Sequence, residues 1–274
     1  MKNININFHK TFKAEGQYIS SILEIADGKT WFTTREISEM TGIPQGKSSG
    51  KVEPHINYAE YMGLIKSEKE KKEKKIKLTK TELGDTVQCE DPGLQEKLTK
   101  LLLHAMMLRD EEGACVWNSI FKHILPQYHN EINKDILILE LNKIYDNRIT
   151  KKNIAPVINV YNDFFSEIGI LDVNDELIRC NSITYDNECV YMYALVLWKY
   201  WEEYYPQQEE ISSTQFAELR FGKAFGWDTQ REYEVMEYLA DKGLIRMNRQ
   251  LMPYTILKLV NEDKLLDNLY SELC

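Results

Sequence analysis

The sequence has little of what marks secreted, fibrous or membrane-spanning proteins. Its five cysteines, Cys89, Cys115, Cys180, Cys189 and Cys274, are scattered and include no C-x-x-C pair, which excludes a closely spaced zinc site and a disulfide framework. The 13 glycines and 7 prolines form no low-complexity linker. There is no run of about 18 apolar residues, and the first residues lack the apolar core of a signal peptide. We therefore expect a cytoplasmic protein with no membrane association, no metal site and no cofactor.

Positive charge is also in short supply. The 274 residues include 34 Lys and Arg against 43 Asp and Glu, which gives a formal net charge of -9. This balance argues against a surface that is uniformly basic for nucleic acid, but attraction to phosphate depends on where the lysines lie rather than on their sum. The chain is 43% hydrophobic and long enough to form about one to three domains with real cores.

A short helix is predicted early in the chain. Thr33 and Glu36 have the spacing of a capping box, in which each side chain bonds the other residue's backbone N–H. The helix that follows would turn Ile37 and Met40 inward. Gly42 is suited to end it, because glycine readily adopts the left-handed conformation that a helix C-terminus often requires.

A second helix is predicted after an irregular turn. Residues 43–51 are too rich in Gly, Pro and Ser for regular structure. Pro54 suits the first turn of a helix because it has no amide hydrogen to leave unpaired. The apolar residues after it share one face up to Gly63, and they are Ile56, Ala59 and Met62.

A β-hairpin is predicted next. Leu64 and Ile65 open a strand, the charged residues 66–75 make the turn, and residues 76–79 return as a strand that alternates apolar and polar side chains. Helix, turn, helix and hairpin together form the order of a winged helix-turn-helix module.

Lysine is concentrated in this hairpin. Residues 66–80 contain eight lysines and three glutamates, a local charge of +5 that leaves -14 for the rest of the chain. Lysines at a hairpin tip beside a helix that could enter a groove are placed to contact DNA phosphates. A solvated hairpin, or a winged module that binds protein, remains the alternative.

The predicted DNA contacts come from the turn, the second helix and the hairpin. The polar face of the second helix, with His55, Asn57 and Glu60, would face the bases, while the lysines would contact phosphates. The full set of predicted DNA-binding residues is Lys47, Ser48, Ser49, Lys51, His55, Asn57, Lys69, Lys71, Lys72, Lys74 and Lys75.

The motifs that signal catalysis are missing. Gly46-Lys47-Ser48 resembles part of a P-loop, but no glycine lies five positions before Gly46 and the preceding residues read as a helix rather than a buried strand. The five histidines show no H-E-x-x-H spacing, and there is no G-x-S-x-G sequence. We therefore expect a protein that is not an enzyme.

One local pattern occurs three times. Residues 58–65, 162–171 and 237–245 each combine an amphipathic helix, a glycine and a short apolar strand. Around the last copy, a capping box at Thr229 and Glu232 and strands at 244–247 and 255–260 predict a second winged module. The unequal spacing argues against a solenoid. Whether the central copy is related or coincidental is left open.

The middle of the chain is predicted to be helical. Residues 93–145 carry leucine and aromatic residues at helical spacing, which is typical of a core face. Residues 190–205 form an aromatic helix that would pack the middle against the C-terminal module, or else offer a partner surface through Trp198 to Tyr205.

These patterns define the expected architecture. It is a mainly α, α+β fold, with winged helix-turn-helix modules flanking a helical middle domain. The predicted domains are an N-terminal winged module at 1–88, the helical domain at 89–205 and a C-terminal winged-helix-like module at 206–274.

Several landmarks occur in the order found in one bacterial family. They are Phe8-His9-Lys10-Thr11-Phe12, then Gly50-Lys51-Val52 through Ile56 to Gly63-Leu64-Ile65, then Leu78-Thr79-x-x-Glu82-Leu83-Gly84, then Glu90-Asp91-Pro92, and finally Leu102, His104 and Trp117. With these landmarks the first 130 or so residues resemble the uncharacterised family called domain of unknown function four thousand and seven. The sequence departs from that family at Lys10, where an acidic residue is usual, and in its lysine-rich hairpin.

The resemblance implies a genomic neighbourhood but no catalytic activity. Members of that family tend to lie beside genes resembling phosphoadenosine-phosphosulfate reductases and other components of DNA sulfur-modification or phage-defence islands. No catalytic residue is carried over. If residues 8–12 are helical, Phe8 and Phe12 would share a buried face, and His9 would act as a hydrogen-bonding plug.

The sequence thus supports a first hypothesis and two alternatives. The first is a DNA-binding accessory or regulatory protein of a bacterial antiviral defence or DNA-modification system, with double-stranded DNA and proteins of the same gene cluster as partners. The second is a protein–protein adaptor in a defence complex. The third is an enzyme subunit whose site a partner completes. Homodimer formation is left open.

Overall fold

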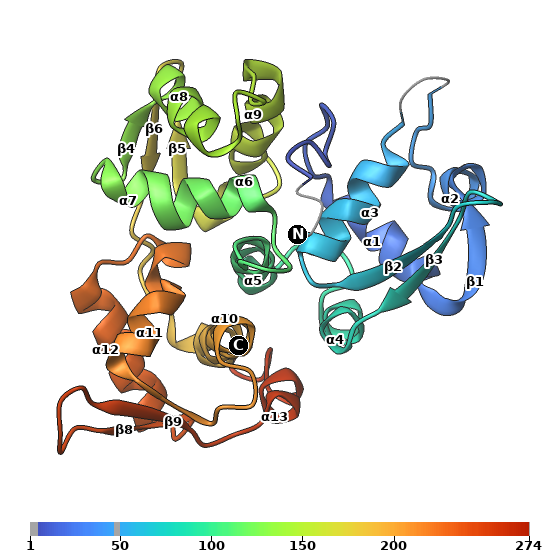
Figure 1. Ribbon diagram of the computed structural model, residues 1–274. Coiled ribbons are helices and arrows are strands. Elements are labelled where there is room, and N and C mark those ends of the chain that lie inside the picture. Colours follow the sequence, from blue (N-terminus) through green and yellow to red (C-terminus); the bar gives the residue numbers. More distant parts are fainter. Residues whose placement is uncertain (1–4, 47–49, 274) are drawn as a thin grey trace.

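The computed structural model describes residues 5–46 and 50–273, which form an α+β fold of many helices and three small antiparallel sheets (Figure 1). The strands are β1 (Asp27–Thr33), β2 (Ile65–Glu70), β3 (Lys75–Lys80), β4 (Glu131–Asn133), β5 (Leu171–Val173), β6 (Leu177–Cys180), β7 (Glu210–Ser212), β8 (Ile245–Asn248) and β9 (Thr255–Lys258).

The helices surround these sheets and connect them. The α-helices are α1 (Gly16–Ile25), α2 (Thr34–Thr41), α3 (Val52–Tyr61), α4 (Glu82–Glu90), α5 (Lys97–Met107), α6 (Cys115–Asn118), α7 (Leu125–Gln127), α8 (Lys134–Ile144), α9 (Lys151–Asn159), α10 (Val190–Tyr204), α11 (Ser213–Leu219), α12 (Thr229–Asp241) and α13 (Glu262–Asp267). A π-helix, η1 (Ser119–Ile124), joins α6 to α7, and the 3₁₀ helices are η2 (Val160–Asn162), η3 (Ser166–Ile168), η4 (Asn187–Cys189) and η5 (Phe221–Phe225).

The same supersecondary unit occurs three times. Each copy runs strand, helix, helix, strand, strand, and each sheet places its third strand between the other two, in the orders β1-β3-β2, β4-β6-β5 and β7-β9-β8. We call these units repeat 1 (27–80), repeat 2 (131–180) and repeat 3 (210–258). They lie at the right, upper left and lower left of Figure 1, with α5 and α10 between them.

Side-chain caps start the first helix of every repeat. The hydroxyls of Thr33 and Ser212 accept the backbone N–H three residues later, and both caps are complete capping boxes. The side chain of Asn133 accepts the N–H of Asp135 at the matching place in repeat 2. Because the cap satisfies an N–H that the helix itself cannot, it fixes the point where the strand turns into a helix.

A left-handed glycine ends the helical part of every repeat. Gly63, Gly169 and Gly243 have φ of 75°, 64° and 71°. The carbonyl of the residue after each glycine accepts the N–H of the residue that follows the last strand. These bonds are Thr81 to Leu64 at 3.0 Å, Asn181 to Ile170 at 2.8 Å and Leu259 to Leu244 at 2.9 Å. The helix-glycine-strand pattern of the sequence therefore marks three equivalent positions.

The central helices join the repeats into one continuous core. In α10, Trp201 and Tyr200 have no exposed surface, and the Tyr200 hydroxyl donates to the carbonyl of Ala105 in α5 at 2.7 Å. His104 of α5 meets the hydroxyl of Tyr161 at 2.7 Å and the carbonyl of Ala224 at 2.9 Å. One histidine thus connects repeat 2 to repeat 3.

Three sequence expectations about the middle and the end of the chain are corrected. The middle is not purely helical, because repeat 2 contains its own sheet. Helix α12 is capped by Asp228 rather than Thr229, and Glu232 is drawn inward, where its carboxylate accepts the N–H of Gly222 at 2.6 Å. Two aromatic residues of the possible partner surface on α10 are not available to a partner, because Trp198 is only 4% exposed and Trp201 is buried, whereas Tyr204 is 37% exposed.

The N-terminal segment is folded as turns rather than as the helix expected for Phe8 to Phe12. Phe8 and His9 are buried against Trp117, with ring centroids 5.6 and 5.7 Å from that indole. His9 is not a hydrogen-bonding plug, since neither ring nitrogen has a partner in the described part of the chain. Met40, expected to face inward, is 57% exposed.

Candidate functional site

The hairpin of repeat 1 presents the strongest local concentration of basic residues predicted from the sequence. Strands β2 and β3 pair from Ile65 opposite Lys80 to Glu70 opposite Lys75, and Ile65, Ile76 and Leu78 anchor the root of the hairpin in the core. Beyond this anchor the side chains reach solvent. We call the lysines at the end of the hairpin the basic tip, and they are Lys69, Lys71, Lys72 and Lys74, all exposed.

The tip lysines differ in their pairing from Lys75, Lys77 and Lys80, whereas Lys66 at the root of the hairpin is exposed and also has no ion pair with the described residues. Lys75, Lys77 and Lys80 lie 2.7, 2.8 and 3.4 Å from carboxylates of Glu73, Glu68 and Asp85, respectively. None of the four tip ammonium groups forms an ion pair with any residue of 5–46 or 50–273. The charge available to an external anion is therefore concentrated at the tip.

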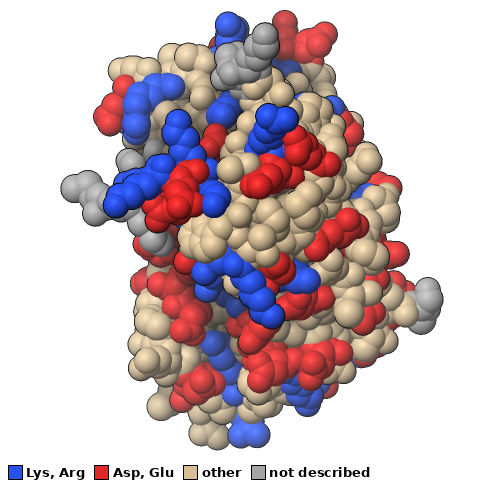
Figure 2. All heavy atoms as spheres, turned by 90° about the vertical axis from the view of Figure 1, so that its right-hand side faces the viewer, with Lys and Arg blue, Asp and Glu red and all other residues tan. Residues whose placement is uncertain are grey.

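The surroundings of the tip are mixed in sign. Figure 2 views the side of the molecule on which repeat 1 lies, and basic and acidic side chains interleave across it without forming a continuous face of one sign. With a net charge of -9, the molecule as a whole repels polyanions. An anion can approach favourably only where unpaired lysines project, and four of them are adjacent at the basic tip, whereas Lys97, Lys152 and Lys264 lie singly on other helices.

Two residues of the predicted contact set are held inside the protein. His55 is buried, so it does not face the bases as expected. Its Nε2 accepts the N–H of Glu15 at 3.2 Å, and its Nδ1 lies 2.7 Å from the carbonyl of Lys51. Burial lowers the pKa of the His55 imidazole. The Lys51 ammonium lies 2.6 Å from a carboxylate oxygen of Glu15. Lys47, Ser48 and Ser49 lie outside the described residues.

The rest of the polar face of α3 is also occupied. Asn57 donates to the carbonyl of Phe8 at 3.2 Å, and Glu60 accepts the N–H of Ser67 at 2.7 Å. Every residue of α3 is buried or half-buried. The expectation that this helix offers its polar side chains to bases is therefore wrong, because the N-terminal segment and the hairpin already use them.

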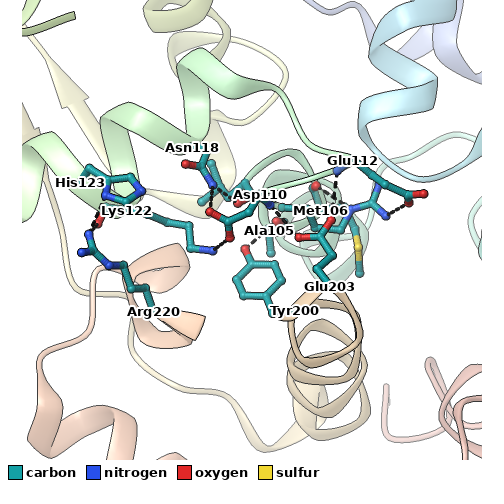
Figure 3. A network of polar contacts seen from close by, with 12 residues as sticks. Ala105, Met106, Asp110, Glu112, Asn118, Lys122, His123, Tyr200, Glu203 and Arg220 are labelled. Atoms are coloured by element: carbon teal, nitrogen blue, oxygen red, sulfur yellow. Dashed lines mark hydrogen bonds and ion pairs between the residues drawn. The ribbon is translucent and has the colours of Figure 1, made fainter. Parts of the chain in front are cut away.

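A second polar cluster lies where α10 and the turn after α5 meet η1 and repeat 3 (Figure 3). The Lys122 ammonium is buried, lies 2.5 Å from Oδ2 of Asp110 and sits over the Tyr200 ring at 4.2 Å from its centroid. Asn118 donates to Oδ1 of the same carboxylate at 3.1 Å. Desolvation lowers the pKa of Lys122, while Asp110 acts in the opposite direction.

Arg220 and Glu203 extend this cluster in two directions. Arg220 donates to the carbonyl of Lys122 at 2.8 Å, and its Nη1 lies 2.7 Å from Nδ1 of His123. The Glu203 carboxylate accepts the N–H groups of Asp110 and Glu112 at 2.7 and 3.0 Å, although burial raises its pKa. These groups satisfy one another, so the cluster fixes the turn at 109–113 and, through Arg220, connects η1 to repeat 3.

A cleft of about 1210 Å³ separates repeat 1 from this turn. Three cations on its walls already have partners within the chain. Lys80 pairs with Asp85, Arg109 pairs with Glu112 at 2.6 Å, and Lys199 pairs with Glu262. Lys66, also on the wall, is exposed and has no ion pair with the described residues, so it carries the unpaired positive charge of the cleft.

Sequence reasoning missed the Lys122–Asp110 cluster for a structural reason. The leucine and aromatic stripe through Trp117 and Phe121 predicts an α-helical core face, on which Lys122 would point outward. Residues 119–124 form a π-helix instead, whose wider turn changes which side chains face inward. The only sequence signal was a lysine among apolar residues.

Comparisons with known proteins identify the fold. Two solved structures are similar over 97% of this chain and 88% of their own, one described as an SspB crystal structure with a TM-score of 0.75 and 14% identity, the other as magnesium ion-bound SspB with a TM-score of 0.76 and 13% identity. At this identity the likeness concerns the fold alone. No protein-family model matches the sequence, and no curated protein matches it significantly.

The magnesium ion in the second SspB structure prompts a test of the acidic residues here. Within the described residues, no group of three or more His, Cys, Asp or Glu side chains is arranged to hold a metal ion. The carboxylates of Asp110, Glu112 and Glu203 are engaged by Lys122, Arg109 and backbone N–H groups, respectively.

No helix within residues 5–46 and 50–273 has both the length and the apolar character needed to cross a bilayer.

Proposed function

We propose that this protein is a non-enzymatic, DNA-binding accessory or regulatory protein of a bacterial defence or DNA-modification system. The observation that carries the proposal is the basic tip, four exposed lysines without ion pairs on a molecule of net charge -9. Lysine ammonium groups bind duplex DNA by replacing the counterions condensed on its phosphates. An acidic body would then orient the protein so that only the tip approaches the duplex.

The order of elements supports a winged-helix assignment for repeat 1. Helix α1, strand β1, helices α2 and α3, and the β2–β3 hairpin follow one another in the order of a winged helix-turn-helix domain. We assign repeat 3, preceded by α10, to the same class. In this assignment the β2–β3 hairpin is the wing of repeat 1.

The biological setting rests on two likenesses. The ordered landmarks of the first 130 or so residues resemble a family found near DNA sulfur-modification and phage-defence genes. The fold is similar to that of SspB over almost the whole chain. Reading the genes that flank this one would test the setting independently of any binding experiment.

A charge-matched pair of variants tests the DNA contact. Lys71→Gln, Lys72→Gln and Lys74→Gln together remove three tip charges. Three exposed lysines without ion pairs on α5, α9 and α13 provide the control, which is Lys97→Gln, Lys152→Gln and Lys264→Gln. Both triple variants change the net charge by -3, so total charge cannot explain a difference between them.

Fluorescence anisotropy with a labelled duplex at low salt is the measurement. We expect the tip variant to bind at least about tenfold more weakly than the unmodified protein, and the control variant to bind almost normally. Equal affinity of the two variants would contradict a contact at the tip.

An adaptor role is the second candidate, and one observation favours it. The β8–β9 hairpin of repeat 3 ends in Leu251 and Met252, which are 80% and 81% exposed. Large apolar side chains this exposed gain free energy when a partner covers them. Co-purification with products of neighbouring genes, lost on Leu251→Ser with Met252→Ser, would support an adaptor.

A further inference from the structure

We infer that the hairpin holds DNA by its phosphates alone, without sequence preference, so any recognition of sequence or modification belongs to a partner. The inference rests on the proposed function and concerns how that contact is made. It follows from two properties of repeat 1. The helix that could read bases is covered, and the exposed tip lacks the side chains that read them best.

The covering of α3 is built from the chain's own N-terminal segment. The Phe8 ring packs on Tyr58 and Tyr61 with centroids 4.9 and 4.5 Å apart. The Tyr58 hydroxyl donates to the carbonyl of Phe12 at 3.0 Å, and Lys10 pairs with Glu53 at 3.1 Å.

Uncovering α3 would be costly. Phe8 is 4% exposed, Tyr58 is fully buried, and Asn57 would lose its bond to the carbonyl of Phe8. Burial of the aromatic rings and the hydrogen bonds across this contact together hold the segment on α3. A recognition helix must place side chains in the major groove, but every residue of α3 is buried or half-buried, and its most accessible carboxylate, that of Glu53, is already paired with Lys10.

The tip itself is suited to phosphates. Residues 69–75 read KEKKEKK, which contains no Arg, Asn or Gln. Those three side chains have planar groups that pair with base edges through two hydrogen bonds in a fixed geometry. Lysine acts on phosphate as a mobile point charge, so its contact depends on the backbone and not on the base pair beneath it.

The salt dependence follows from the number of lysines. Four phosphate contacts give a slope of log affinity against log salt of about -3.6 for duplex DNA. The affinity would then fall roughly 150-fold when salt rises fourfold. That slope should be the same for every duplex sequence, because each duplex releases the same number of counterions.

The experiment compares duplexes of equal length, one containing only A·T pairs, one only G·C pairs, and one mixed sequence with its scrambled form. The unmodified full-length protein is titrated by anisotropy at several salt concentrations, beside the tip variant. We expect affinities within about threefold across the four duplexes, whereas specific sites usually exceed non-specific ones by about a thousandfold or more. The tip variant should lose affinity for all four equally.

The outcomes separate this inference from the proposed function. A preference of more than about tenfold for one duplex, lost in the tip variant, overturns the inference and leaves DNA binding by the tip intact. Binding to none of the duplexes overturns both. Equal affinities with one common slope support both.

Discussion

The Lys122 ammonium lies 2.5 Å from Oδ2 of Asp110 and is completely buried, while the Asp110 side chain keeps 23% of its surface exposed. A buried ammonium is stable only while its counter-charge stays in place, because removing it from water costs several kcal/mol. This pair therefore holds the turn at 109–113 against the π-helix η1.

Replacing Asp110 by Asn tests that role. The substitution preserves shape and leaves the buried ammonium without a full counter-charge, so we expect the free energy of unfolding to fall by about 3 to 5 kcal/mol. Urea denaturation of the variant and the unmodified protein measures this difference in unfolding free energy. Asp135→Asn is the matched control, because the Lys151–Asp135 pair at 2.7 Å is exposed and contributes less than about 1 kcal/mol. Equal losses in both variants would contradict a buried pair.

Removing both charges together should cost less than removing Asp110 alone. Lys122→Met combined with Asp110→Asn leaves no uncompensated charge, and part of the lost stability should return. If the double variant loses as much unfolding free energy as the two single variants lose together, the two residues do not interact.

Acid should destabilise the protein between about pH 6.5 and 4. Burial lowers the pKa of His9 and of His104 from 6.5 to about 4. In this window the unfolded chain binds protons at both residues and the folded chain does not, so stability is complete above pH 6.5 and falls as pH falls. Each of the two pKa shifts corresponds to a loss of roughly 3 kcal/mol in the free energy of unfolding once the pH has fallen below about 4. Unfolding curves at several pH values measure how steeply the free energy of unfolding falls with pH. His9→Gln should make this dependence shallower. An unchanged dependence would contradict the assignment to His9.

Gly84 should not tolerate a side chain. A Cβ there would lie 2.0 Å from the carbonyl oxygen of Leu64, a backbone atom that cannot move aside cheaply. We expect Gly84→Ala to lower the free energy of unfolding by about 3 kcal/mol. At Gly93 the new methyl group meets only the flexible Gln95 side chain at 3.3 Å, and Gly93→Ala should change stability by about 0.5 kcal/mol or less. Thermal unfolding measures the stability of both variants. A Gly84→Ala variant that is as stable as the Gly93→Ala variant, or more stable, would contradict close packing of α4 on the Leu64 carbonyl.

The apolar tip of repeat 3 should be dispensable for folding. Leu251→Ser with Met252→Ser exposes no core, so the unfolding free energy should stay within about 0.5 kcal/mol. Ile256→Ser on the same hairpin should cost 2 kcal/mol or more, because Ile256 has no exposed surface. A large loss in the first variant would indicate that the tip packs within the chain rather than serving a partner.

Local sequence signals predicted the ends of some elements. The lysine-rich hairpin is present, but the turn predicted at 66–75 is too long, because β2 runs to Glu70 and β3 begins at Lys75. The capping box at Thr33 and Glu36 and the left-handed Gly42 are present as predicted. Each depends on residues a few positions apart, so a single sequence contains the whole signal. Strands β4, β5 and β6 are only three or four residues long, which is too short to show an alternating pattern, and the sheet of repeat 2 was missed for that reason.

The candidate site was only partly predictable because burial depends on distant segments. The exposed tip lysines follow from the hairpin alone. His55 and Asn57 look polar and available in the sequence, yet Glu15 and Phe8, some 40 to 49 residues earlier, occupy them. Lys122 is buried because a π-helix changes its direction. Long-range contacts of this kind leave no trace in local spacing.

The salt dependence of duplex binding tests the central claim most directly. For the unmodified protein and for the Lys71→Gln, Lys72→Gln, Lys74→Gln variant, log affinity is plotted against log salt concentration. If the tip contacts phosphates, losing three contacts makes the slope shallower by about 2.7. Parallel lines for the two proteins would show that the tip lysines release no counterions and would contradict the account.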